Sequence, residues 1–444
     1  MKIVIVGAGI SGLAAAHHLR EAGHEAVIYE ASDRAGGRGM LLNRPGTDDW
    51  ADVGSQYYHS NYTHGLKLIE DLGLTSKLKK IEGASRVFTS ETDSYVMEVQ
   101  RPWMKDGGIL GNLRVGFYIS KLLWAMRSSS PYAPLKNKTA FDRTKALDST
   151  SSAFVKDRAV RTMSLAGGLN EPADADVSKL QMARWTKIMM TTDSLSLIGG
   201  TATLHDRLAK QSDIRLNRPV KGLIETEGRV SGIELDNGER VQADHVVVAA
   251  DVRSAANIAP ADWSFEQAFL SGVKMLPTHI VSFFLDRQLE EGVWSYIMPM
   301  GHQGPVSFCV DAQQKSPVNH PSGKATLQAW IVSPKSLALV DKSDSEIADI
   351  ALQDIAPFMT GVVDAVEGSH VKRHYAALPQ TSVGHNERVF AFLDAIDQRP
   401  GVSFCGDYFS GGYIESALWS VDRAMPLILS DLARSNTQAM GVDG

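Results

Sequence analysis

The sequence predicts an α/β protein in which a parallel-sheet domain is interrupted by a second, α+β domain. Two short apolar runs, residues 2–6 and 402–405, lack polar alternation and are typical of strands buried in a parallel sheet. A helical pattern follows the first run over 11–22, and a further strand is predicted at 26–29, which completes a βαβ unit. Segments of different character separate these pieces, so we expect the chain to cross between two domains several times.

The order of the segments predicts that both domains are discontinuous. Residues 219–250 read as a three-stranded meander that ends in a buried strand, and Asp236-Asn237-Gly238 contains a strong hairpin signal. Residues 81–198 are mostly helical in pattern, whereas 278–335 resemble strands. A last helix is expected from about Glu415. The predicted parallel-sheet domain comprises residues 1–80, 199–270 and 385–444, and the second domain comprises residues 81–198 and 271–384.

The composition is that of an ordinary globular protein. Of 444 residues, 43% are apolar and 22% are charged, and the formal net charge is −6, which argues against nucleic-acid binding. Only two cysteines occur, so a disulfide framework is excluded and a reducing, cytoplasmic compartment is expected. The sequence has no long uninterrupted apolar run, so stable membrane insertion is not expected. Residues 112–126 are the most apolar long stretch, for which a buried or pocket-lining helix is expected and a membrane-touching helix is the alternative.

A glycine motif, Gly7-Ala8-Gly9-Ile10-Ser11-Gly12, joins the first strand to the first helix. An acid, Glu30, stands at the end of the second strand, 18 residues after Gly12. This context is that of a Rossmann-like dinucleotide-binding fingerprint. In it Gly7 permits the turn, Gly9 admits a pyrophosphate, Gly12 lets helix and strand pack closely, and Glu30 accepts hydrogen bonds from a ribose. The free N–H groups of the helix N-terminus would face the phosphates.

Two further motifs fit the same kind of site. Asp33 to Arg38 contains two adjacent glycines between two arginines, and arginine forks suit phosphate oxygens. Strand 402–405 ends in Gly406-Asp407, which places a carboxylate at the carboxyl edge of the sheet, where ligands bind in such folds. We therefore expect both segments to line the nucleotide site.

Together these motifs resemble the FAD-dependent amine oxidase superfamily, which includes monoamine and polyamine oxidases, protoporphyrinogen oxidase and carotenoid desaturases. The strongest matches are GAGISGLAAAHHL from Gly7, YEASDRAGGR from Tyr29 and FCGDYFSGGYIESA from Phe404. Shorter matches are ADVGSQYY at 51–58, IGGTATL at 198–204, RPV at 218–220, ADHVVVAA at 243–250 and AALP at 376–379. The matches span the whole chain.

The resemblance implies bound FAD, with Glu30 on the adenosine ribose, Arg38 by the pyrophosphate and Val220 at the adenine. It also implies Asp407 near the ribityl-phosphate region, and a helix from about Glu415 that aims its N-terminus at the flavin. Monoamine oxidases carry a flavin-linked cysteine that has no counterpart here, so non-covalent FAD is expected. The predicted cofactor-binding residues are Gly7, Gly9, Ile10, Ser11, Gly12, Glu30, Ala31, Gly37, Arg38, Gly54, Ser55, Val220, Gly406, Asp407, Glu415 and Ser416.

The substrate site is less well marked. Tyr413 resembles the second tyrosine of the aromatic cage of amine oxidases and is the predicted catalytic residue, acting as a cavity wall. The first cage tyrosine is absent, because the alignment places Val383-Gly384 there. Gln56, Tyr57 and His59 are candidates for the pocket, although strand packing would also explain them. The spacing of histidines and cysteines predicts no metal site.

The resemblance implies an enzyme that transfers hydride from a substrate C–H bond to flavin N5, with dioxygen as the expected oxidant and peroxide as product. Oxidation of an amine CH–NH bond is the first reading. CH–CH dehydrogenation of a larger apolar substrate, as in protoporphyrinogen oxidase or the desaturases, is the alternative that residues 112–126 and the missing tyrosine favour. A non-catalytic binder of prenylated partners, of the escort-protein type, is disfavoured because the FAD motifs are intact. A flavin reductase is disfavoured because no second fingerprint serves NAD(P)H. The expected partners are therefore a small-molecule substrate and dioxygen, and the oligomeric state stays open.

Overall fold

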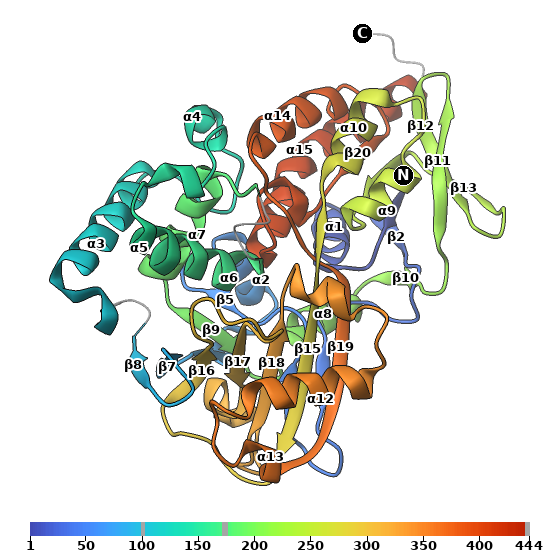
Figure 1. Cartoon of the computed structure of the whole chain (residues 1–444). Coiled ribbons are helices and arrows are strands. Elements are labelled where there is room, and N and C mark those ends of the chain that lie inside the picture. The colour runs from blue at the N-terminus through green and yellow to red at the C-terminus, as the bar shows by residue number, and fades with distance from the viewer. Residues whose placement is uncertain (99–102, 171–175, 440–444) are drawn as a thin grey trace.

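The computed structural model describes residues 1–98, 103–170 and 176–439. Figure 1 shows a helix-covered sheet with a hairpin meander at the upper right, a large sheet below it and a group of helices at the left. None of the predicted site residues lies in the gaps between the described ranges.

The first sheet is wholly parallel, as the sequence predicted, and the α/β fold class is confirmed. Its strand order is β10-β2-β1-β14-β20. Residues Ile3 and Ile5 of β1 pack in the core beneath α1 (Ile10–Glu21) and α15 (Ile414–Ala439), whereas Val4 and Val6 pack in the core of the opposite face. Burial on both faces explains the unbroken apolar runs. The strands are Asp213–Arg215 (β10), Glu25–Tyr29 (β2), Lys2–Val6 (β1), His245–Val248 (β14) and Val402–Phe404 (β20).

The predicted meander is also present. Strands β11 (Val220–Thr226), β12 (Arg229–Leu235) and β13 (Arg240–Gln242) form a separate antiparallel sheet before the chain enters β14. Helices α9 (Val252–Ile258), α10 (Ser264–Gly272) and α14 (His385–Ile396) cover the face of the parallel sheet that lies opposite α1. Val220 is the first residue of this meander and follows β10, the edge strand of the parallel sheet.

The second large sheet has seven strands in the order β19-β15-β18-β17-β16-β7-β8. All neighbouring pairs are antiparallel except β16 and β7. One face packs on α12 (Asp344–Ile355) through residues such as Val281, Phe283 and Ile331. The strands are Val366–Pro379 (β19), Met275–Leu285 (β15), Thr326–Ile331 (β18), Phe308–Asp311 (β17), Val293–Ile297 (β16), Ala84–Phe88 (β7) and Ser94–Met97 (β8).

Helices form the third part, as the pattern of residues 81–198 predicted. Helix α3 (Gly108–Ala125) packs on α7 (Lys179–Thr191), next to α5 (Ala153–Val155), α6 (Thr162–Gly168) and a π-helical turn at Lys156–Arg161. The prediction missed β7, β8 and β9 (Ser194–Leu197) in the same segment. Strand β7 pairs with β16, and β9 pairs with β5 (Tyr58–His59) and β6 (Leu78–Lys80), so partners outside the helical stretch define them. Among the described residues no helix has the length and apolar character to cross a membrane.

Candidate active site

A large cavity of about 1550 Å³ lies where the parallel sheet, the seven-stranded sheet and the helices meet. Its volume exceeds that of pockets for drug-sized ligands, which occupy roughly 300–1,000 Å³. One end is lined by the glycine motif, and the other end by side chains of the seven-stranded sheet and of α6 and α7. The cavity therefore has room for a large cofactor together with a substrate.

The turn between β1 and α1 forms the first wall of the cavity. Gly7 has φ +100°, and its N–H donates to the carbonyl of Tyr29 at 2.8 Å. Gly9, Ile10 and Ser11 line the cavity at the start of α1, which has no side-chain cap, so the N–H groups of its first turn remain available to a ligand. Gly12 lies behind them, where a Cβ would stand 1.9 Å from the carbonyl oxygen of Gly7. This is the close packing that the motif requires at its third glycine.

Glu30 lies at the same end of the cavity, beside Ala31 and Val220. One carboxylate oxygen accepts the N–H of Ala8 at 2.7 Å, and the other accepts the N–H and hydroxyl of Ser32 at 2.9 and 2.7 Å. Glu30 is thereby fixed between the glycine turn and the loop that follows β2. Its carboxylate is part of the cavity wall, where it can accept hydrogen bonds from the hydroxyl groups of a ribose.

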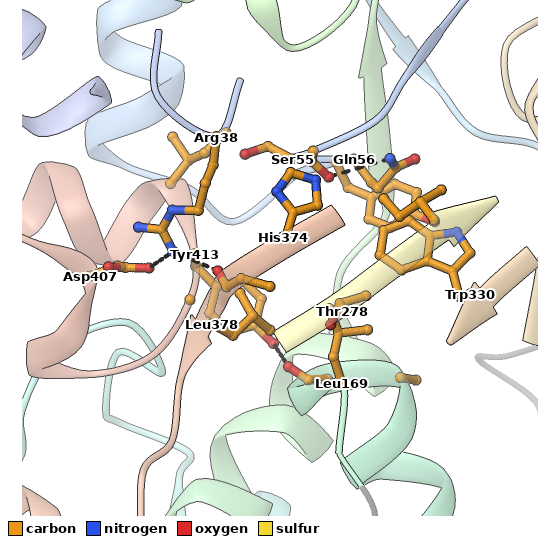
Figure 2. A pocket seen from close by; sticks show the side chains of 18 of the residues that line it. Arg38, Ser55, Gln56, Leu169, Thr278, Trp330, His374, Leu378, Asp407 and Tyr413 are labelled. Atoms are coloured by element: carbon orange, nitrogen blue, oxygen red, sulfur yellow. Dashed lines mark hydrogen bonds and ion pairs between the residues drawn. The ribbon is translucent and has the colours of Figure 1, made fainter. Parts of the chain in front are cut away.

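An ion pair between Arg38 and Asp407 lies in the cavity wall, as Figure 2 shows. The Arg38 guanidinium donates to the Asp407 carboxylate at 2.7 Å and to the carbonyl of Ala377 at 2.7 Å. Burial lowers the pKa of Arg38, but the attraction of Asp407 outweighs it and the net shift is upward. The family resemblance implies that these side chains contact different parts of one cofactor. In the structure they are also paired with each other.

Glycines bring the separate motifs into contact around this pair. A Cβ on Gly37 would lie 3.1 Å from Cα of Gly9, and one on Gly54 would lie 1.9 Å from the carbonyl oxygen of Arg38. Ser55, the next residue, donates its N–H to that same carbonyl at 2.9 Å. Gly37, Gly54, Ser55 and Gly406 all line the cavity. Three distant segments therefore form one continuous backbone wall.

Glu415 and Ser416 do not line the cavity, contrary to expectation. The buried Glu415 carboxylate accepts the N–H groups of Thr63, His64 and Gly65 at 2.6, 2.9 and 2.8 Å, and so caps α2 (His64–Asp71). Ser416 is fully buried away from the cavity. The reason is helical geometry. Helix α15 begins at Ile414, and its positions 414 and 417 face the cavity while 415 and 416 turn away.

Tyr413 lies at the opposite end from Glu30. Its ring makes edge contacts with His59 and Tyr132, with centroids 6.1 and 5.5 Å apart, and its hydroxyl donates to the carbonyl of Gly167 at 3.4 Å. Burial raises the pKa of Tyr413 well above its usual range and lowers that of His59 to about 4. Both side chains are therefore neutral near pH 7, and neither supplies a charged base.

Leu378 lines the cavity close to Tyr413, whereas Val383 and Gly384, which the alignment places at the first cage tyrosine, do not line it. Leu378 lines the cavity from β19, and a Cβ on Gly412 would stand 2.1 Å from its side chain. Val383 and Gly384 lie beyond the end of β19, where Gly384 begins α14, and they do not line the cavity. Figure 2 shows Leu378 and Tyr413 close together on one side of the cavity.

The candidates Gln56 and Tyr57 also line the cavity. Behind them lies a buried pair, in which the ammonium of Lys315 is 3.6 Å from the Asp52 carboxylate and donates to the side-chain oxygen of Gln56 at 2.7 Å. The same ammonium lies 5.2 Å from the centre of the Tyr57 ring. Burial raises the pKa of Asp52, although Lys315 opposes it, and burial lowers that of Lys315. This pair fixes the Gln56 amide from behind.

No sequence motif marks several further residues of the cavity wall. Strand register brings Thr278 beside His374 and Ile280 beside Trp330, all four facing the cavity. Among the described residues, the hydroxyls of Thr278 and Ser307 and the indole N–H of Trp330 are buried and have no hydrogen-bond partner. The period-2 pattern of these strands was visible in the sequence, but which face meets the cavity was not.

His374 lies on β19 close to Ser55 in Figure 2. Its Nε2 hydrogen-bonds the carbonyl oxygen of Val53 at 2.6 Å, and burial lowers its pKa to about 4. The ring is therefore neutral and is fixed in orientation. Within the described ranges no group of histidine, cysteine or acidic side chains is arranged to hold a metal ion. Cys309 and Cys405 are buried and do not line the cavity.

Comparisons with known proteins show the family. The family model described as flavin containing amine oxidoreductase matches residues 10–424. Coproporphyrinogen III oxidase of Bacillus subtilis is 25% identical over 92% of this chain and 94% of its own length. A 15-cis-phytoene desaturase of Solanum lycopersicum is 24% identical over 86% of this chain and 69% of its own. Cyclohexylamine oxidase of Brevibacterium oxydans shares the fold, with a TM-score of 0.76 and 19% identity over 97% of this chain and 99% of that one.

Proposed function

Because the chain belongs to the family of flavin-containing amine oxidoreductases, we propose that this FAD-dependent oxidoreductase removes hydride from a C–H bond of a large, mainly apolar substrate. FAD, when bound, supplies the acceptor for two electrons and the hydride. The family assignment bears out the prediction of an FAD enzyme. The choice of substrate and the roles of individual residues belong to the proposal.

The residues at the glycine end fit FAD. The glycines that line the cavity keep its wall free of Cβ atoms, and the N-terminus of α1 offers N–H groups to phosphate oxygens. Glu30 would accept from the adenosine ribose, Val220 would bind adenine through its backbone, and the Arg38–Asp407 pair would contact the middle of the cofactor. Neither cysteine lines the cavity, which favours non-covalent binding. Acid precipitation should then release all FAD into the supernatant, and flavin that stays with the chain would refute this part.

The substrate proposal depends on the apolar composition of the cavity wall beyond Tyr413. The aliphatic side chain of Leu378 lines the wall close to Tyr413, whereas Val383 and Gly384, the expected position of the first cage tyrosine, do not line the cavity. Most of the side chains beyond Tyr413 are apolar: Met104, Ile119, Met163, Leu165, Leu169, Ile188, Met189, Met190, Met298 and Phe308. Such flexible and apolar side chains suit a bulky apolar ligand.

The neutral groups around Tyr413 would orient this substrate without taking a proton from it. Tyr413 would form a flat wall. His59 and His374 are neutral, so neither would form an ion pair with the substrate. Positioning of this kind accelerates a reaction by alignment.

Amine oxidation with dioxygen is the second candidate, and one observation favours it. Tyr413 and Tyr132 form adjacent aromatic surfaces next to neutral His59, in a region where a neutral amine could be bound without a charged partner. The sequence analysis placed this reaction first. We place it second because the cavity is large and the first cage tyrosine has no counterpart.

A single experiment separates the two reactions. The yellow protein is mixed without oxygen with porphyrinogens, apolar polyenes, primary amines and amino acids, and the loss of flavin absorbance is followed. We expect a porphyrinogen or polyene to reduce the flavin fastest. The variant Leu378→Tyr should slow these bulky substrates at least tenfold and leave small amines unaffected. Fast reduction by an amine alone, with peroxide formed on admission of air, would overturn the proposal in favour of the second candidate.

A further inference from the structure

The most exposed apolar surface of the molecule lies on helix α3 and the residue stretch before it. We define the α3 face by six side chains that are 61–74% exposed: Trp103, Ile109, Leu110, Leu113, Phe117 and Trp124. Among the described residues, every other large apolar side chain is less exposed than these six, and the next is Tyr375 at 56%. In Figure 1, α3 lies at the outer edge of the helical group.

Helix α3 is apolar on two opposite sides. Val115, Tyr118, Ile119 and Leu122 are buried and join the core that α3 shares with α5 and α7. The α3 face lies on the other side, because Ile109, Leu113, Phe117 and Trp124 recur at the spacing of a helix turn. A helix of a soluble domain normally presents polar residues on its outer side. The outer side of α3 therefore requires a partner that accepts apolar side chains.

The charge beside the α3 face is positive, although the whole chain carries −6. Between Trp103 and Arg127 the sequence holds four basic residues, Lys105, Arg114, Lys121 and Arg127, and one acid. That acid, Asp106, is paired with Arg158. No acid occurs within α3 itself. The partner of this surface should therefore be anionic as well as apolar.

Two of these cations are held against the apolar face. The Lys121 ammonium lies 5.0 Å from the centre of the Phe117 ring, and the Arg127 guanidinium lies 4.0 Å from that of Trp124. Basic groups at the edge of an aromatic and aliphatic face are the arrangement by which a helix lies in the boundary between lipid headgroups and acyl chains. Tryptophan, which has an apolar body and a polar N–H, is suited to that boundary.

We propose that the α3 face docks the protein reversibly on a lipid bilayer that contains anionic lipids. The helix lies in the plane of the surface, with the six apolar side chains among the acyl chains and the cations at the headgroups. A second copy of the chain fits less well, because a twofold contact would bring the basic residues of two α3 faces together and α3 has no acid to pair with them. The inference goes beyond the proposed reaction and rests on exposure and charge alone.

The position of the α3 face connects it with the cavity. Met104, next to Trp103, and Ile119, on the inner side of α3, both line the cavity. The docking surface and the apolar end of the cavity are thus two sides of the same segment. A protein docked by this face would hold that end of its cavity next to the lipid, where apolar molecules concentrate.

The test is cosedimentation of the full-length protein with vesicles of phosphatidylcholine, with and without about 30 mol% phosphatidylglycerol. We expect binding to the anionic vesicles that weakens in about 0.5 M KCl. Phe117→Ser with Trp124→Ser should lower the partition coefficient tenfold or more. Arg114→Gln with Lys121→Gln should lower it about fivefold per charge on anionic vesicles only. The control, Phe265→Ser with Leu337→Ser, removes two side chains that are 52% and 54% exposed elsewhere and should bind as wild type does.

Circular dichroism and thermal unfolding verify that each variant is folded. The proposal is overturned if the Phe117/Trp124 variant binds as tightly as wild type, if the control loses as much binding, or if neutral and anionic vesicles bind equally. It is also overturned if sedimentation velocity shows a dimer that the α3 substitutions dissociate while no vesicle binds, because a second copy then covers this face. The docking proposal does not require a variant to lose reaction rate and vesicle binding to the same extent. A negative result in the vesicle test therefore leaves the proposed reaction unaffected.

Discussion

The two sides of the cavity are built in different ways. The side formed by the parallel sheet consists largely of backbone, because glycines at 7, 9, 37, 54 and 406 contribute no side chains to it. The side formed by the seven-stranded sheet consists of side chains two residues apart, such as Thr278 and Ile280, and of their neighbours His374 and Trp330 on adjacent strands. Contiguous motifs suffice for a backbone wall, whereas a side-chain wall depends on strand register. The difference teaches why the cofactor end of such a protein is easier to infer than its substrate end.

Gly12→Val tests the packing beneath the backbone wall and should have the largest effect. Because a Cβ at Gly12 would stand 1.9 Å from the carbonyl of Gly7, α1 must move away from β1. We expect a loss of about 4 kcal/mol or more in the free energy of unfolding, with loss of FAD. Gly272→Val is the matched control, since a Cβ there meets nothing within 4 Å. Equal thermal stability of the two variants would contradict the close packing.

Glu415→Gln distinguishes a structural carboxylate from a cofactor ligand. The substitution weakens three hydrogen bonds from backbone N–H groups at the start of α2. We expect the free energy of unfolding to fall by about 2–3 kcal/mol, whereas FAD affinity in the folded protein stays the same. Denaturant unfolding and FAD titration measure the two quantities. Unchanged stability with weaker FAD binding would place Glu415 at the cofactor after all.

Glu30→Ala should do the opposite of Glu415→Gln. A carboxylate that accepts hydrogen bonds from a ribose contributes about 1.5–3 kcal/mol, so FAD binding should weaken tenfold to a hundredfold, with a smaller effect on unfolding. Glu25→Ala, on the exposed start of β2, serves as the control. FAD retention equal to wild type would show that Glu30 only ties Ala8 and Ser32 together.

Tyr413 tests the side-chain wall, where the smallest effect is expected. Tyr413→Phe keeps the ring and should retain most activity, because the hydroxyl makes only one long hydrogen bond, to Gly167. Tyr413→Ala should lower kcat/KM about tenfold, since an aromatic contact contributes roughly 0.5–1.5 kcal/mol and alignment is lost as well. Steady-state rates with any substrate that reduces the flavin decide this. An Ala variant that matches wild type with its flavin spectrum intact would remove Tyr413 from the proposed site.

The sequence by itself determined the parallel sheet, the βαβ unit and the segments that form the backbone wall. It could do so because each of these features depends on neighbouring residues: an apolar run, a glycine turn and an acid at a fixed spacing. The tertiary structure alone decided that Arg38 pairs with Asp407, that Leu378 lies against Gly412 and that Glu415 caps α2. It alone also decided which apolar side of α3 is buried and which is exposed. These outcomes depend on helix phase, on strand register and on contacts between segments hundreds of residues apart, and no local pattern of residues encodes them.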